Sequence, residues 1–197
     1  MKQANLTADD WAAAALDAIA RGGLAAVSVE SLARELNVTK GSFYWHFRSR
    51  QALIQAALAL WEKSETDDIF ALAQTIDDPR KRLNAVFREA TTSSRTGRLM
   101  LALAAASDDP VIGEFIRRVT KRRLEFVRDC YIALGQAPEE ARRWATFAYS
   151  TFVGGLQLAR DNPDALPQGS DMQEYLRLCI NTLVPRQPVL EPVRKAG

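Results

Sequence analysis

The apolar residues of this chain recur at helical spacing from end to end. Near the N-terminus, Trp11, Ala15 and Ile19 fall on one face of a predicted helix that Thr7 can cap. The segment Arg21-Gly22-Gly23 closes the pattern, because glycine readily adopts the left-handed conformation found at helix ends. No sustained period-two alternation, the signature of a half-buried strand, occurs anywhere. The pattern therefore predicts an all-α fold with about nine helices.

Start signals for further helices recur along the chain. Capping residues or prolines precede apolar periodic segments at Ser28, Thr39, Ser49, Pro79, Pro110 and Pro138, and a last helix carries Met172 to Leu183. The helix that begins after Ser49 is long and is expected to continue toward residues 66–68. A segment rich in proline and charge, residues 185–197, follows the last helix and is expected to be a flexible tail.

The segment from Ser28 to Phe47, SVESLARELNVTKGSFYWHF, contains two short helical patterns with a turn between them. The turn falls at Asn37, a residue type that tolerates positive φ better than most. In the second pattern, Phe43 and Phe47 are four residues apart and are expected to face the core together. Two short helices joined by a tight turn are typical of a helix-turn-helix.

The outward positions of the second helix carry small, polar and aromatic side chains. Between Asn37 and Arg50 there are three basic residues, Lys40, Arg48 and Arg50, and no acidic one. Gly41 permits close approach, and the exposed amide end of the helix favours phosphate. Such a surface fits the major groove of DNA.

Residues from about Thr7 to Leu60 resemble the DNA-binding domain of the TetR family of bacterial transcriptional regulators. The resemblance rests on the helix-turn-helix followed by Tyr44-Trp45-His46, Arg50 and Leu53. Asn37 replaces the usual glycine of the turn, and Arg50 replaces the usual lysine. The resemblance implies base contacts by Thr39, Lys40, Gly41, Ser42 and Trp45, and phosphate contacts by Ser28, Tyr44, His46 and Arg50.

Alternatives remain open at several of these positions. Trp45 could pack beneath its own helix, Lys40 could be merely solvated, and His46, the only histidine, could be structural. A second basic run, residues 121–123, is a rival DNA site, but such runs are usually a solvated helix face. The region around Lys2 could also reach a DNA backbone as an arm.

The helix after Pro138 is apolar on two sides and therefore needs covering on two sides. A deeply buried helix in a monomer is one solution. The family resemblance implies the other, a four-helix bundle made by the last two helices of each of two subunits. The expected interface residues are Phe147, Thr151, Gly154, Gly155, Leu158, Tyr175 and Cys179.

Aromatic and large apolar residues of the helical body are candidates for the wall of a small-molecule pocket, although most such residues are core. They are Trp61, Phe87, Met100, Phe126, Tyr131, Trp144 and Phe147. No effector can be named from them. The two cysteines, Cys130 and Cys179, lie among apolar helical residues, where a reduced thiol is more common than a redox switch.

Composition limits the remaining possibilities. The chain has 197 residues, of which 47% are hydrophobic and 25% charged, and a net charge of +2 that does not by itself imply nucleic acid. It has no apolar run long enough to span a membrane and no secretory leader, so a cytoplasmic protein is expected. It also lacks nucleophile-elbow, phosphate-loop and metal-ligand motifs, which disfavours an enzyme and predicts no cofactor and no metal.

These patterns together predict a helix-turn-helix domain in residues 1–50 and a larger effector-binding and dimerisation domain in residues 51–184. The expected function is that of a ligand-responsive transcriptional regulator. We expect a homodimeric repressor that a small molecule releases from a palindromic DNA operator. The alternative is a helical interaction protein of the same fold that has lost effector or DNA binding.

Overall fold

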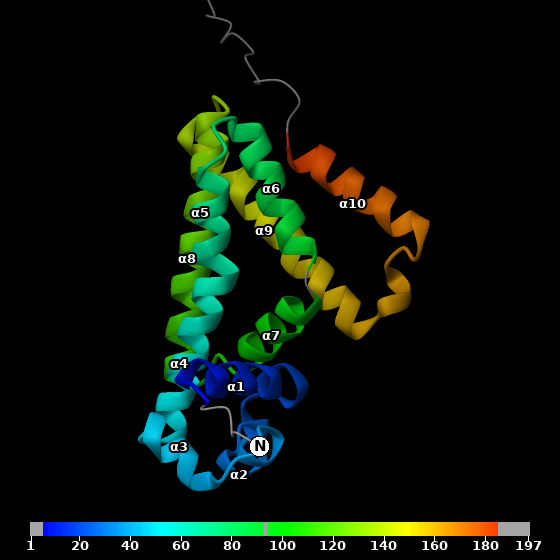
Figure 1. Ribbon diagram of the computed structural model, residues 1–197. Coiled ribbons are helices and arrows are strands. Elements are labelled where there is room, and N and C mark those ends of the chain that lie inside the picture. Colours follow the sequence, from blue (N-terminus) through cyan, green and yellow to red (C-terminus); the bar gives the residue numbers. More distant parts are fainter. Residues whose placement is uncertain (1–5, 93, 185–197) are drawn as a thin grey trace, which may run out of the picture. The chain divides into compact units, whose positions relative to one another are not determined.

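The computed structural model describes residues 6–92 and 94–184, which form helices and connecting turns without a strand in those ranges. Lys2 and the tail, residues 185–197, lie outside the described part. The helices, coloured along the chain in Figure 1, are α1 (Ala8–Gly22), α2 (Val29–Glu35), α3 (Lys40–His46), α4 (Arg50–Glu62), α5 (Asp68–Gln74), α6 (Pro79–Thr92), α7 (Ser94–Ala105), α8 (Pro110–Ala133), α9 (Pro138–Asp161) and α10 (Ser170–Leu183).

The all-α prediction is confirmed. A π-helical turn, Lys63–Asp67, joins α4 to α5 without a break, as expected for a long helix that continues past residue 66. If this continuous segment is taken as one helix, the described residues contain nine α-helices, the expected number. Two short 3₁₀ turns, Leu24–Ala26 and Pro163–Ala165, lie in the connections.

The predicted helix starts are confirmed where a cap or a proline marked them. The Thr7 hydroxyl accepts a hydrogen bond from the Asp10 amide at 3.2 Å, and the Asp10 carboxylate accepts one from the Thr7 amide at 2.7 Å. Ser49 caps α4 in the same manner, accepting from the Ala52 amide at 3.1 Å. Gly23 ends α1 with a φ of 68°. These contacts span three or four residues, which is why the sequence reveals them.

The chain divides into two compact units that are not contiguous in sequence. Among the described residues, unit 1 comprises residues 6–69 and 94–120, and unit 2 comprises residues 70–92 and 121–184. In unit 1, α1 packs against α4 and α7, and the fully buried Trp11 and Ile19 belong to its core. The expected domains, residues 1–50 for DNA binding and 51–184 for effector binding and dimerisation, were defined by function and not by packing. That division stays a prediction.

Unit 2 has its own core, built from α6, the second half of α8, α9 and the end of α10. Alanines on one face of α9, Ala141, Ala145 and Ala148, are buried there and allow close packing against Tyr131 and Leu83. The Tyr131 hydroxyl donates a hydrogen bond of 2.6 Å to the buried Leu183 carbonyl, which fastens the C-terminal end of α10. No helix within residues 6–92 and 94–184 has the length and apolarity needed to cross a membrane.

Candidate nucleic-acid interface

The first four helices, α1 to α4, form what we call the head. Asn37, at the turn between α2 and α3, has a φ of 54°, as its residue type suggested. The next amide, that of Val38, donates to the Ala33 carbonyl at 2.9 Å and closes the end of α2. Phe43 is fully buried and meets the Trp11 ring edge-on, with ring centroids 5.4 Å apart. Together these contacts fix α3 against the rest of the head.

The opposite side of α3 carries the predicted contact residues. Trp45 is 88% exposed and Tyr44 60% exposed, so the alternative that Trp45 packs beneath its helix is wrong for this chain. Thr39, Lys40, Gly41 and His46 are also exposed, and Ser42 is half-buried. Large aromatic side chains that lie mostly in water contribute little to the core, and two adjacent ones suggest a contact surface. The structure therefore brings the predicted base-facing residues onto one short helix.

Thr39 occupies the N-cap position of α3 as predicted, but its side chain makes no capping hydrogen bond. The expectation that its hydroxyl caps this helix is therefore corrected. The Ser42 amide is instead bonded to the Thr39 carbonyl at 3.0 Å, as in an ordinary first turn. The Thr39 hydroxyl is consequently not committed to a cap and can serve another partner.

Lys40 forms an ion pair with Glu30, in the first turn of α2. The hydrogen bond from the Lys40 ammonium holds the pKa of the Glu30 carboxyl below its ordinary value and raises the pKa of Lys40. Both groups are therefore charged at neutral pH. The sequence did not indicate this ion pair, because the stretch between residues 37 and 50 has no acidic residue and Glu30 is ten positions before Lys40.

Arg50 is held by backbone carbonyls at the connection between α1 and α2. Its Nε donates to the Val27 carbonyl at 2.7 Å, and one terminal nitrogen donates to the Leu24 carbonyl. The guanidinium therefore links the start of α4 to a segment more than twenty residues earlier. A guanidinium has five N–H donors, so the two bonds leave donors for a phosphate.

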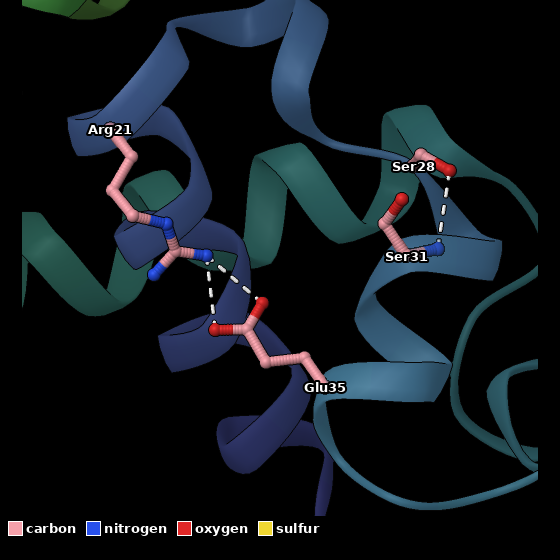
Figure 2. Close-up of polar contacts among 4 residues, drawn as sticks. All are labelled: Arg21, Ser28, Ser31 and Glu35. Atoms are coloured by element: carbon pink, nitrogen blue, oxygen red, sulfur yellow. Dashed lines mark hydrogen bonds and ion pairs between the residues drawn. The ribbon is translucent and has the colours of Figure 1, made fainter.

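Ser28 has a structural contact of its own. Its half-buried hydroxyl accepts a hydrogen bond from the Ser31 amide at 3.3 Å and thereby caps α2. Figure 2 shows this cap beside a second link in the head, in which Arg21 at the end of α1 donates to the Glu35 carboxylate at 2.9 and 3.0 Å. The Arg21–Glu35 pair is exposed and contributes little to stability, but it joins α1 to the end of α2.

The predicted ligand-pocket residues divide between the two units. In unit 1, Trp61 and Met100 are buried. In unit 2, Tyr131 is fully buried, Phe126 stacks on Phe70 with ring centroids 4.0 Å apart, and Phe87 is half-buried against the core. Trp144 lies between Tyr131 and Phe147, with centroid distances of 6.0 and 5.9 Å. Most of these residues have core contacts, and their role in binding stays a prediction.

A groove of about 620 Å³ lies between α6 and α10 in unit 2. Its lining is mainly polar and includes Asn84, Gln173, Arg177 and Asn181. The predicted pocket residues are not among those that line it. The sequence did not indicate this groove, since its residues come from helices about ninety positions apart and form no motif.

The predicted dimer surface is partly exposed. On α9, Phe147 is 50% exposed, Leu158 is exposed, and a side chain added at Gly154 or Gly155 would meet nothing within 4 Å. Thr151 is half-buried, as are Tyr175 and Cys179 of α10. Apolar side chains and bare backbone in water on one helix are consistent with a surface that another body covers.

The cysteines differ in environment. Burial raises the pKa of the Cys130 thiol to about 11, so at neutral pH it is almost entirely protonated and poorly nucleophilic. Cys179 is half-buried on α10, and its hydrogen bond with Tyr175, with some burial, raises the pKa of that phenol. Cys130 is thus a core residue of unit 2.

Comparison with known proteins agrees with this geometry. Residues 12–57 match the sequence profile of bacterial regulatory proteins of the tetR family. The HTH-type transcriptional regulator TtgR from Pseudomonas putida is 29% identical over 185 residues, covering 83% of this chain and 84% of that protein.

Solved structures resemble this fold over most of its length. The structure of a TetR transcriptional regulator from Legionella pneumophila aligns with a TM-score of 0.76 and 19% identity, covering 91% of this chain and 98% of that one. That of SmeT, the repressor of the Stenotrophomonas maltophilia multidrug efflux pump SmeDEF, aligns with a TM-score of 0.66 and 19% identity over 90% of this chain and 88% of that one.

Proposed function

Since the chain belongs to the TetR family of bacterial regulatory proteins, we propose that it represses transcription as a homodimer whose two heads bind a palindromic operator. The chain is a DNA-binding transcriptional regulator and not an enzyme. The observation that carries the proposal is the division of α3 into a buried side at Phe43 and an exposed side at Tyr44 and Trp45.

Within this proposal, α3 enters the major groove. Lys40 reads a guanine edge, Trp45 makes apolar contact with bases, and the small residues Thr39, Gly41 and Ser42 allow close approach. Tyr44, His46, Ser28 and the spare donors of Arg50 contact phosphates and fix the register of the head. The four phosphate contacts come from the start of α2, from α3 and from α4, so their spacing depends on the intact head.

Two heads are needed for sequence selectivity, because a single recognition helix of seven residues contacts few bases. A symmetric dimer that holds the heads one DNA turn apart, about 34 to 36 Å, matches two half-sites of a palindrome. We assign the dimer contact to the exposed side of α9, including Phe147, Thr151, Gly154, Gly155 and Leu158, with Tyr175 and Cys179 of α10.

Effector release follows from population shift. A small molecule that binds the body better when the heads are away from operator spacing lowers operator affinity by the ratio of its two binding constants. The candidate wall residues are Trp61 and Met100 in unit 1 and Phe87, Phe126, Tyr131, Trp144 and Phe147 in unit 2. A regulator acting on chromosomal operators works in the cytoplasm of a bacterium.

The experiment that tests the proposal selects bound duplexes from a random DNA pool with the full-length protein. The proposal predicts a recovered palindrome whose half-sites are one helical turn apart. The double substitution Lys40→Ala with Tyr44→Ala should leave folding intact, because both side chains are exposed, and should weaken operator binding at least about tenfold.

Lys121→Ala is the matched control, since it removes one exposed lysine from the rival basic run. It should leave operator affinity within about twofold of wild type, because a solvated helix face makes no DNA contact. The assignment is wrong if Lys121→Ala abolishes binding while the double variant binds normally. Failure of the wild-type protein to enrich any sequence would instead favour the interaction-protein alternative.

A further inference from the structure

Glu30 is an acidic residue that lies against the predicted reading surface. Its carboxylate pairs with the Lys40 ammonium and also accepts a hydrogen bond from the Ser28 hydroxyl at 3.3 Å. Glu30 and Lys40 both line an open groove of about 520 Å³ between α2 and α3. Lys40 therefore has a partner within the protein before any DNA arrives.

We propose that Glu30 limits operator affinity, because it holds Lys40 in an internal ion pair that persists on non-operator DNA and that an operator base must displace. The inference rests on the proposed function, in which Lys40 contacts a guanine edge. On a random duplex, a single phosphate offers Lys40 no more than Glu30 already does, so the internal pair persists. On the operator, guanine O6 and N7 accept hydrogen bonds, and the ammonium exchanges partners.

The consequence is asymmetric between the two kinds of DNA. Replacement of Glu30 by Gln leaves Lys40 without its carboxylate partner, so that it contacts phosphate on any duplex and releases one further counter-ion. Non-specific affinity should rise, and the slope of log K against log salt should steepen by about 0.9 on random DNA only. Operator affinity should rise by at least as much, because operator binding no longer has to break the Glu30–Lys40 pair.

Glu30→Gln suits this test because the amide keeps an oxygen for the Ser28 hydroxyl and loses only the negative charge. Glu35→Gln is the matched control. It makes the same change on the same helix, in an exposed pair whose partner is Arg21 and not a predicted base reader (Figure 2). A general effect of net charge would act through both variants alike, whereas release of Lys40 acts through the first alone.

The experiment measures binding of the full-length wild type, Glu30→Gln, Glu35→Gln, Lys40→Ala and the Glu30→Gln/Lys40→Ala double variant to the selected operator and to a scrambled duplex, across a salt series. Operator affinity should rise about two- to fivefold in Glu30→Gln, the range expected when an exposed ion pair no longer has to be broken. It should be unchanged in Glu35→Gln. The Glu30 effect should also vanish when Lys40 is already alanine.

Two other outcomes overturn the inference in different ways. If Lys40→Ala loses operator affinity while the two glutamine variants change operator affinity alike, Glu30 does not act through Lys40, yet the proposed function stands. If Lys40→Ala binds the operator as wild type does, the predicted base contact fails and the inference fails with it. Thermal unfolding of each variant confirms that the comparison is between folded proteins.

Discussion

Phe43 and Trp45 lie two positions apart in α3, and the first is fully buried while the second is 88% exposed. This contrast allows stability and DNA binding to be separated by single substitutions. Phe43→Ala removes a ring that contacts Trp11, Phe47 and Tyr44, and it should cost about 3–5 kcal/mol of unfolding free energy. Trp45→Ala should alter stability by less than about 0.5 kcal/mol.

The exposed residue of this pair should matter for DNA binding although it does not matter for stability. Trp45→Ala should lower operator affinity several-fold, since the indole lies almost entirely in water and a base contact is its predicted role. Chemical denaturation followed by circular dichroism measures the stability, and fluorescence anisotropy with labelled operator measures the affinity. A Trp45→Ala protein that binds as well as wild type would remove Trp45 from the predicted surface.

At the level of helices and turns, local interactions explain what the sequence could reveal. Helix ends at Thr7, Gly23, Ser49, Pro79 and Pro138 depend on residues at most four positions apart, so the chain reveals them directly. The buried side of α3 was likewise readable from helical spacing, and the positive φ at Asn37 from its residue type at the turn.

Contacts between distant segments were not readable in this way. The partners of Arg50 are 23 and 26 residues earlier in the chain, and the sequence offers no motif for an arginine that binds carbonyls. For the same reason, nothing indicated that residues 94–120 join the N-terminal segment in one compact unit. Such pairings depend on how the helices pack. The periodicity of a single sequence shows which side of each helix is apolar, but not which other helix covers that side.

Arg50 gives a prediction at this level, because its bonds join the start of α4 to the connection before α2. Arg50→Ala removes two donors from carbonyls that the fold holds in place, and it should destabilise the protein by about 1–3 kcal/mol. Arg50→Lys should recover part of that loss, since one ammonium can reach a carbonyl but cannot reproduce the planar fork.

Urea denaturation of the three proteins measures this effect, with Arg48→Ala as the control. Arg48 is an exposed arginine in the same turn, and removing it should leave stability nearly unchanged. A purely phosphate-binding Arg50 would give the opposite pattern, in which both Arg50 variants are as stable as wild type and only DNA affinity falls.

For the whole protein, the proposed function requires two heads, and α9 carries the surface on which that requirement can be tested. A side chain built at Gly154 meets no atom within 4 Å, so the folded subunit has room for a larger residue there. The Gly154→Leu variant should therefore fold. Its α9 should be slightly more stable, because a glycine inside a helix is destabilising by about 0.5–1 kcal/mol relative to alanine. In a dimer that packs backbone against backbone at Gly154, the same leucine would collide with the second copy.

Sedimentation at micromolar concentration should then show a dimer for the wild type and a monomer for Gly154→Leu. Thr146→Leu is the control, since it places a leucine at an exposed α9 position outside the predicted interface and should leave the dimer intact. Because each monomeric head still folds, Gly154→Leu should keep weak, salt-sensitive binding to a half-site and lose the gain from two linked heads on the palindrome. If the Gly154→Leu protein remains dimeric, the interface does not lie on this face of α9. If the wild type sediments as a monomer, one short recognition helix must account for all sequence selection.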